Sequence, residues 1–266
     1  MRVYVLNNGY LECDSNQLVA FDTCATARDH NPVHNWITIP VYAVLIHHPD
    51  AAILFDTGCH PEAMNGRWPD SLAMLFPYTF KEEHRLENQL RLAGCKPSDV
   101  GIVVQSHLHM DHAGNLDLFT HADVYVHKAE FEHGQRLVHQ NPNPATHGGY
   151  IKADLDVPCR FQLVDRDFEL VPGVEVITLP GHTPGVLGLI LNLKKEGTLI
   201  FPMDALYQRA NYGPPARMPG IVYDSVQFFA SVEKVRRLAG KHNARVMFSH
   251  DMAFFETMKM TPEFYE

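Results

Sequence analysis

Three histidines and one aspartate lie within six positions of the short run SHLHMDHAGN, residues 106–115. His107 and His109 are two residues apart at the end of an expected strand, so their side chains point the same way and can reach one metal ion. Asp111 and His112 follow where the chain turns towards a helix, and they can point to an adjacent position. Chance produces HxHxDH in about one such chain in a few hundred, so the run predicts a metal site.

Three further residues that could bind metal each stand at the end of an expected strand. His182 lies in LPGHTPG, Asp204 in FPMDALY and His250 in MFSHD. Strand ends gather side chains at one rim of a sheet, so these three can join the histidine run. His182 alone would be explained as well by a core histidine, but the three together favour metal ligands. Imidazole and carboxylate without thiolate suit zinc, cobalt, iron or manganese.

The elements that must position these residues alternate between strands and helices. The expected strands are 2–6, 40–48, 51–56, 101–106, 122–127, 174–180, 186–193, 198–204 and 244–250. The expected helices are 82–94, 127–139, 224–240 and 251–260. This alternation predicts an α/β protein whose sheets are covered by helices on their outer faces. Residues 57–82, rich in glycine, proline and aromatic side chains, are expected to form a long loop that serves as a lid or a dimer interface. Gly114 is expected to give the turn after the histidine run its backbone freedom.

Composition excludes several classes of protein. A chain of 266 residues, 45% hydrophobic and 20% charged, predicts one folded domain over 1–266. A net charge of −9 without a basic cluster argues against nucleic acid binding. Five scattered cysteines without a CxxC pair predict neither a disulfide framework nor a thiolate zinc site. No apolar run reaches the roughly 20 residues that span a bilayer, and the N-terminus lacks the features of a secretory signal, so we expect no membrane association and a cytoplasmic location.

The order of these motifs resembles the metallo-β-lactamase superfamily: HxHxDH, a GH turn, an aspartate after a strand and a final SHD. DTG at 56–58, after an apolar strand, matches the first motif of that superfamily. The resemblance covers nearly the whole chain. It implies a four-layer αβ/βα sandwich with a dinuclear metal site at one edge of the two sheets.

The same resemblance implies two sets of ligands and a bridge between them. The ligands implied for one metal are His107, His109 and His182. The ligands implied for the other metal are Asp111, His112 and His250. Asp204 would bridge both metals, and Asp56 would orient the imidazole ligands. Zinc is the expected metal, with cobalt, iron and manganese as alternatives.

Such a site favours hydrolysis. A water held between two divalent metals becomes a hydroxide near neutral pH, and a metal polarises the carbonyl that the hydroxide attacks. Di-iron oxidoreductases of the superfamily typically carry glutamate where this chain has His109, and its nucleases carry extra domains or basic arms. True β-lactamases are exported and usually lack the carboxylate that Asp204 supplies. Thiolester hydrolases of the glyoxalase II type remain an alternative.

Further stretches resemble the N-acyl-homoserine lactonases, which open quorum-sensing signals. These stretches are DALY at 204–207, NYGPPAR at 211–217, CHPEAMNGRW at 59–68 and the terminal SHDMAFFETMKMTPEFYE. The resemblance implies that Tyr207 donates a hydrogen bond to the lactone carbonyl or ring oxygen. Asp111 would pass a proton to the leaving alkoxide after the bridging hydroxide attacks. The implied substrate is a small acyl lactone.

Two other functions remain as alternative hypotheses. The SHDM run and the LPGH turn also resemble 4-pyridoxolactonases, which would favour a flat, polar pocket. A non-catalytic metal-binding or sensor module is the third hypothesis, but a sensor has no need of the phenol of Tyr207. An acyl chain would need an apolar groove, and the aromatic segment 57–82 suggests a homodimer. The candidates for the groove are Met110, Trp36, Trp68, Phe76 and Tyr78.

Overall fold

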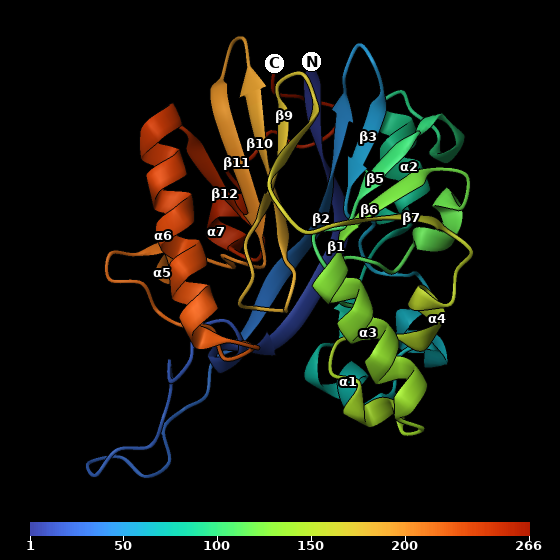
Figure 1. Cartoon of the computed structure of the whole chain (residues 1–266). Helices are drawn as coiled ribbons and strands as arrows, with labels where there is room; N and C mark the ends of the chain where they lie inside the picture. The colour runs from blue at the N-terminus through green and yellow to red at the C-terminus, as the bar shows by residue number, and fades with distance from the viewer.

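Two β-sheets face each other at the centre of the computed structural model, which describes all 266 residues (Figure 1). The first sheet contains β1 (Arg2–Asp14), β2 (Trp36–His47), β3 (Ala52–Phe55), β4 (Tyr78–Thr79), β5 (Ile102–Val104), β6 (Asp123–His127) and β7 (Arg160–Val164). The second contains β8 (Phe168–Val171), β9 (Val174–Thr178), β10 (Leu187–Leu193), β11 (Gly197–Met203) and β12 (Arg245–Phe248). Their strand orders are β4-β1-β2-β3-β5-β6-β7 and β12-β11-β10-β9-β8.

Seven helices surround the two sheets. They are α1 (Asp70–Leu75), α2 (Leu86–Leu92), α3 (Lys128–Gln140), α4 (Lys152–Leu155), α5 (Arg209–Tyr212), α6 (Ser225–His242) and α7 (Met252–Phe255). The helices α5 and α6 lie outside the second sheet, whereas α2, α3 and α4 lie beyond the first (Figure 1). The predicted four-layer αβ/βα sandwich is therefore confirmed. None of the helices combines the length and apolarity that a membrane span requires.

The main core lies between the two sheets. Val44 and Phe55 of the first sheet and Leu189 and Phe201 of the second belong to one cluster of fully buried side chains. The strands β3, β5 and β6 pair in parallel, which requires cover on both faces and explains their short, continuous apolar runs. This packing places the ends of strands from both sheets close together.

The predicted helix at 224–240 is confirmed as α6, and its ends show why it forms there. The Asp224 carboxylate accepts a hydrogen bond from the Gln227 N–H at 3.0 Å and caps the first turn. The helix stops at Asn243, which adopts the left-handed conformation. Phe228, Val232 and Val235 are buried at helical spacing, so one apolar stripe of α6 packs on the second sheet.

Several expectations about elements were wrong. Residues 57–82 are not a loop: a helical turn at Ala63–Arg67, then α1 and β4, fold around the buried Trp68. The expected helix 82–94 starts only at Leu86, after a separate 3-10 turn. The closing helix 251–260 is only the four residues of α7, because the chain then turns back and the Val3 N–H bonds to the Tyr265 carbonyl.

The edge strands β7 and β8 were missed. Their residues are half-buried or exposed and include charged side chains, so their sequences lack the apolar run of a buried strand. The first strand is also longer than expected, because β1 continues past residue 6 through a bulge to Asp14.

Candidate metal centre

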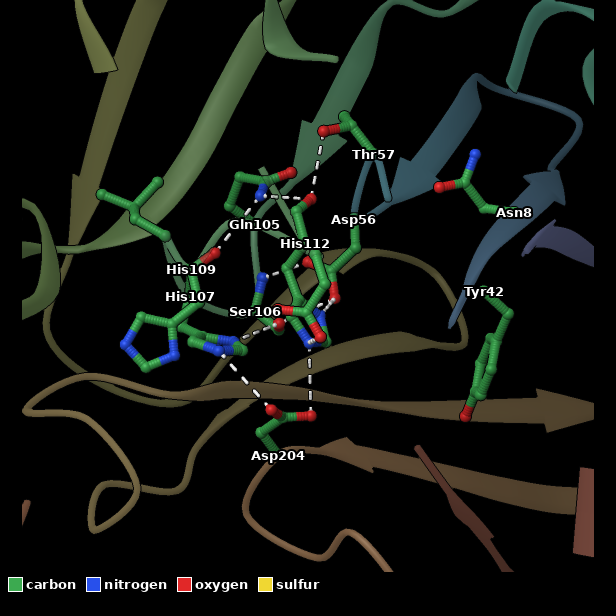
Figure 2. Close-up of polar contacts among 12 residues, drawn as sticks. Asn8, Tyr42, Asp56, Thr57, Gln105, Ser106, His107, His109, His112 and Asp204 are labelled. Carbon is green, nitrogen blue, oxygen red and sulfur yellow. Dashed lines mark hydrogen bonds and ion pairs between the residues drawn. The ribbon is translucent and has the colours of Figure 1, made fainter. Parts of the chain in front are cut away.

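The structure brings all seven predicted ligand side chains into one cluster between the sheets. His107 follows β5 of the first sheet, whereas His182, Asp204 and His250 follow β9, β11 and β12 of the second. Asp204 points from its strand end towards the histidine run of the facing sheet (Figure 2). The strand ends of the two sheets therefore place these side chains close together, as the sequence predicted.

Three imidazoles form the group predicted to hold the first metal. Nε2 of His182 lies 3.2 Å from Nε2 of His107 and 3.0 Å from Nδ1 of His109. The rings stand edge to face, with each pair of centroids 4.6–4.8 Å apart. Three ring nitrogens thus converge on one point. We call His107, His109 and His182 the first group.

One carboxylate and two imidazoles form the other set. Oδ2 of Asp111 lies 3.5 Å from Nε2 of His112 and 3.5 Å from Nε2 of His250. All three side chains are buried. We call Asp111, His112 and His250 the second group.

The carboxylate of Asp204 lies between the two groups. Its Oδ1 is 3.1 Å from Nε2 of His250 and 3.3 Å from Nε2 of His112. Its Oδ2 is 3.5 Å from Nε2 of His182 and 3.6 Å from Nε2 of His107. One oxygen therefore faces each group, which is the arrangement a bridging ligand requires (Figure 2).

The outer nitrogens of the rings explain why the inner ones suit a cation. Nδ1 of His112 lies 2.8 Å from Oδ2 of Asp56, and Nδ1 of His250 lies 2.9 Å from the Pro40 carbonyl. In the neutral ring that a metal ligand requires, each of these contacts holds the proton on Nδ1 and leaves the Nε2 lone pair directed inward.

The centre also contains buried atoms without hydrogen-bond partners. Nε2 of His112 and Oδ1 of Asp204 are buried and lie 3.3 Å apart, yet neither makes a hydrogen bond of acceptable geometry. Unpaired buried polar atoms are costly, so native proteins rarely leave them without a partner or an ion. Converging imidazole and carboxylate lone pairs, with no thiolate, fit divalent cations such as zinc.

The two groups differ in electrostatics. Burial lowers the pKa of His107 well below its usual value, and the neighbouring His112 and His109 lower it further. Burial also lowers the pKa of His109, to about 3. Burial opposes the charged form of His112 as well, but the carboxylates of Asp204 and Asp111 outweigh it and raise its pKa well above the usual value.

Asp56, the residue predicted to orient the ligands, is fully buried beneath the second group. Its Oδ2 accepts from the Ser106 hydroxyl at 2.7 Å as well as from His112, and its Oδ1 accepts from the Ser106 N–H at 2.6 Å. Asp56 has a φ of 62°, a conformation that costs most residues about 1–2 kcal/mol. This backbone conformation lets the Asp56 carboxylate, directly after β3, form hydrogen bonds with Ser106 and His112.

The sequence analysis missed Gln105, a buried residue whose side chain holds the turn of the histidine run in place through hydrogen bonds. Its amide nitrogen donates to the carbonyl oxygens of His107 and His112 at 3.2 and 2.9 Å (Figure 2). The only sequence signal is one polar residue at the end of an apolar strand. Gly114 is needed for a different reason than expected: a Cβ there would lie 2.3 Å from the His60 nitrogen, so close approach, not a special φ, requires glycine.

Tyr207, a predicted catalytic residue, lies against the first group. Its hydroxyl oxygen is 2.7 Å from Nδ1 of His182, and that nitrogen also lies 3.2 Å from the Ile221 carbonyl. If Nδ1 carries the proton shared between these two acceptors, the phenol keeps its own proton free to donate. Burial, and then the charges of Asp204 and Asp111, raise the pKa of Tyr207 well above its usual value, so the phenol stays protonated.

A cavity of about 290 Å³ opens onto the metal centre. Asp111, Tyr207 and His250 are among its lining residues, half of which are hydrophobic. Among its apolar lining residues are Leu18, Ile39, Leu72, Phe76, Met110 and Ile221.

Of the five residues proposed for an acyl groove, two line this cavity: Met110 and Phe76. Trp68 and Tyr78 are buried packing residues with ring centroids 6.1 Å apart. Trp36 is 54% exposed, and its indole N–H donates to Glu12. The other three candidates were therefore wrong, because loop position alone does not tell which way an aromatic side chain points.

The fold and this cluster define a class of metallohydrolase, and comparison with known proteins names it. Residues 36–250 match the family model described as the metallo-beta-lactamase superfamily. The chain belongs to this superfamily.

Relatives of the chain carry more specific names. An N-acyl homoserine lactonase of Agrobacterium fabrum, AiiB, is 37% identical over 280 residues, covering 100% of this chain and 99% of the relative. An N-acyl homoserine lactonase of a Bacillus species is 30% identical over 251 residues, covering 89% of this chain and 93% of that one.

A solved structure shows the same fold. A crystal structure of a mutant AiiA from B. thuringiensis, with N-decanoyl-L-homoserine bound at its active site, matches with a TM-score of 0.84 and 24% identity. The match covers 99% of this chain and 98% of that one.

Proposed function

We propose that this protein is a metal-dependent hydrolase that opens the lactone ring of N-acyl homoserine lactones. The observation that carries the proposal is that Tyr207, Asp111 and members of both ligand groups line one cavity, half of whose lining residues are hydrophobic. The lactonases that share up to 37% of its sequence over the full chain support the same substrate class.

In this proposal the first group would hold one divalent cation and the second group another, with Asp204, whose two oxygens face the two groups, as a ligand shared by both. Zinc is the metal we propose, with cobalt, iron and manganese as alternatives. When bound, the pair of cations would lower the pKa of water and polarise the lactone carbonyl. Asp56 fixes His112 in the orientation and tautomer that this role requires.

Tyr207 acts on the carbonyl oxygen of the substrate. Because its phenol is protonated and faces the cavity, it donates a hydrogen bond to the oxygen on which negative charge develops. A donor placed in advance in a buried site stabilises that charge strongly, and the loss of such a donor typically costs about 100–1,000-fold in rate.

Asp111 moves the proton. Burial would raise its pKa, but His112 and His250 lower it below the usual value, so the carboxylate is ionised and can accept a proton. During hydrolysis a bond forms between the carbonyl carbon and a water oxygen, and the ring C–O bond breaks. Asp111 transfers the proton of that water to the ring oxygen, which leaves as the alcohol of homoserine.

The cavity beyond these residues receives the acyl chain. Met110 and Phe76 lie on its walls together with Leu72 of α1, so the segment 57–82 supplies part of the groove. An apolar wall favours an alkyl chain over the flat, polar ring of pyridoxolactone, because unpaired polar groups are costly against it.

We also propose that residues 1–266 form a single catalytic domain, since both sheets supply ligands. We propose a homodimer as well, for which exposed apolar side chains such as Phe21, Val33 and Met74 are available. We propose a cytoplasmic location as well. Light scattering tests the homodimer, and cell fractionation tests the location.

The function is tested by proton release. Hexanoyl- and octanoyl-homoserine lactone are added to the metal-loaded protein in weak buffer with a pH indicator, because ring opening yields an acid. Homoserine lactone without an acyl chain, pyridoxolactone and a glutathione thiolester serve as comparison substrates. Rapid release with the acyl lactones, and slow release with the others, is expected. A fully loaded protein that leaves the acyl lactones intact would contradict the proposal.

A further inference from the structure

Glu130 is a buried acid that the proposed reaction does not use. It lies in the first turn of α3, directly behind the histidine run, and none of its surface is exposed. A buried carboxylate is costly unless it is paired or hydrogen-bonded, so its contacts show what its burial achieves.

One oxygen of Glu130 connects to the first group in two ways. Oε1 accepts from the backbone N–H of Leu108 at 3.0 Å, and Leu108 is the residue between His107 and His109. Oε1 also accepts from the Tyr150 hydroxyl at 2.9 Å. The Tyr150 ring packs edge to face against His109, with centroids 4.7 Å apart.

The rest of the carboxylate faces the turn that carries His182. Burial raises the pKa of Glu130, whereas the nearby Thr183 hydroxyl and Gly185 N–H lower it. Oε2 of Glu130 and the Thr183 hydroxyl are both buried and make no hydrogen bond of acceptable geometry.

We propose that Glu130 is the positioning residue of the first group, binding together the three chain segments that carry or cover His107, His109 and His182. It does for this group what Asp56 does for His112, but through backbone and tyrosine contacts rather than through a ligand ring. The inference rests on the proposed metal centre. It predicts that loss of Glu130 weakens the first metal position and spares the second.

The test measures metal binding rather than turnover. Metal-free wild type is titrated with Co²⁺, whose visible absorption reports binding, and two equivalents per chain are expected. Glu130→Ala is then made in two backgrounds: His250→Ala disables the second group, and His182→Ala disables the first. In the His250→Ala background the loss of Glu130 is expected to weaken Co²⁺ binding about 10–100-fold. In the His182→Ala background it should change binding less than about twofold.

Two further variants keep the test decisive. Glu130→Gln retains an acceptor for Leu108 and Tyr150 but turns an amide N–H towards Gly185, so it should fold and weaken only the first position, by less than alanine does. Asp154→Asn is the matched control, because Asp154 is a buried acid of α4 that accepts from Arg67 at 2.7 Å. It should leave both positions unchanged.

The outcomes separate the two claims. Weakening confined to the His250→Ala background supports the role of Glu130. Equal weakening in both backgrounds, or none in either, overturns it. A wild type that binds fewer than two equivalents contradicts the metal centre itself, whatever the Glu130 variants do.

Discussion

The two ligand groups lie side by side and are held in different ways. The second group contains its own carboxylate, Asp111, and has a second one, Asp56, bonded directly to a ligand ring at 2.8 Å. The first group consists of imidazoles alone. Asp56 reaches it only through the Ser106 hydroxyl, which lies 3.0 Å from Nδ1 of His107, and Glu130 reaches it through the Leu108 backbone and Tyr150. The second group is thus held mainly by charged carboxylates, whereas the first group is held mainly by packing and backbone contacts.

This difference predicts which substitutions weaken metal binding at each group. Buried charges interact strongly over short distances, so the second group depends on its balance of carboxylates and imidazoles. Neutral rings interact weakly, so the first group depends on the packing that aims three lone pairs at one point. Substitutions that remove charge should therefore affect the second group, and substitutions that disturb packing should affect the first.

The largest effect is expected for Asp204→Asn, because Asp204 alone faces both groups. An amide cannot bridge two cations as a carboxylate does, so activity should fall by about 1,000-fold or more, equivalent to several kcal/mol of lost stabilisation. Proton release with hexanoyl-homoserine lactone measures the rate, and metal analysis measures occupancy. Retention of both metals and of more than about a tenth of the activity would break the account of Asp204 as the shared ligand.

Tyr207→Phe separates chemistry from metal binding. Removal of the hydroxyl deletes a donor to the substrate oxygen but leaves His182 its bond to the Ile221 carbonyl. We expect kcat to fall about 100-fold with both metals still bound. Steady-state kinetics beside metal analysis check this, and a phenylalanine variant with wild-type kcat would remove Tyr207 from the mechanism.

Asp56→Asn should weaken the second position. An asparagine keeps the shape but loses the charge that holds the Nδ1 proton of His112, so metal affinity at this position should fall about 10–100-fold. Titration with Co²⁺ should show one weakened and one normal equivalent. Weakening of the first position instead would contradict the division of labour between Asp56 and Glu130.

The smallest effect is expected for Gly149→Ala, which changes only the packing around the first group and none of its charges. A Cβ at this position would lie 2.8 Å from two ring carbons of His109, so that ring must move. Overpacking of this kind costs about 1–3 kcal/mol, and we expect about a tenfold loss of affinity at the first position. The adjacent Gly148 has open space around its Cβ position, so Gly148→Ala is the control for inserting a methyl group, although its φ of 62° adds some strain.

Several of the proposed ligands could be found from sequence because they follow strand ends, where a short apolar run signals the strand and the polar residue after it stands out. His107, Asp204 and His250 are of this kind. Gln105 and Glu130 could not be predicted, because a single glutamine or glutamate carries no pattern and its partners are distant backbone groups. The segment 57–82 was misread because its helical turns are too short to show periodicity.

Activity measured against metal added tests the central claim most directly. Metal-free protein is titrated with Zn²⁺ or Co²⁺ while the opening of hexanoyl-homoserine lactone is followed by proton release. If two cations share Asp204, activity should rise until about two equivalents per chain are bound and then stay constant. Full activity at one equivalent, or none at two, would contradict a dinuclear lactonase.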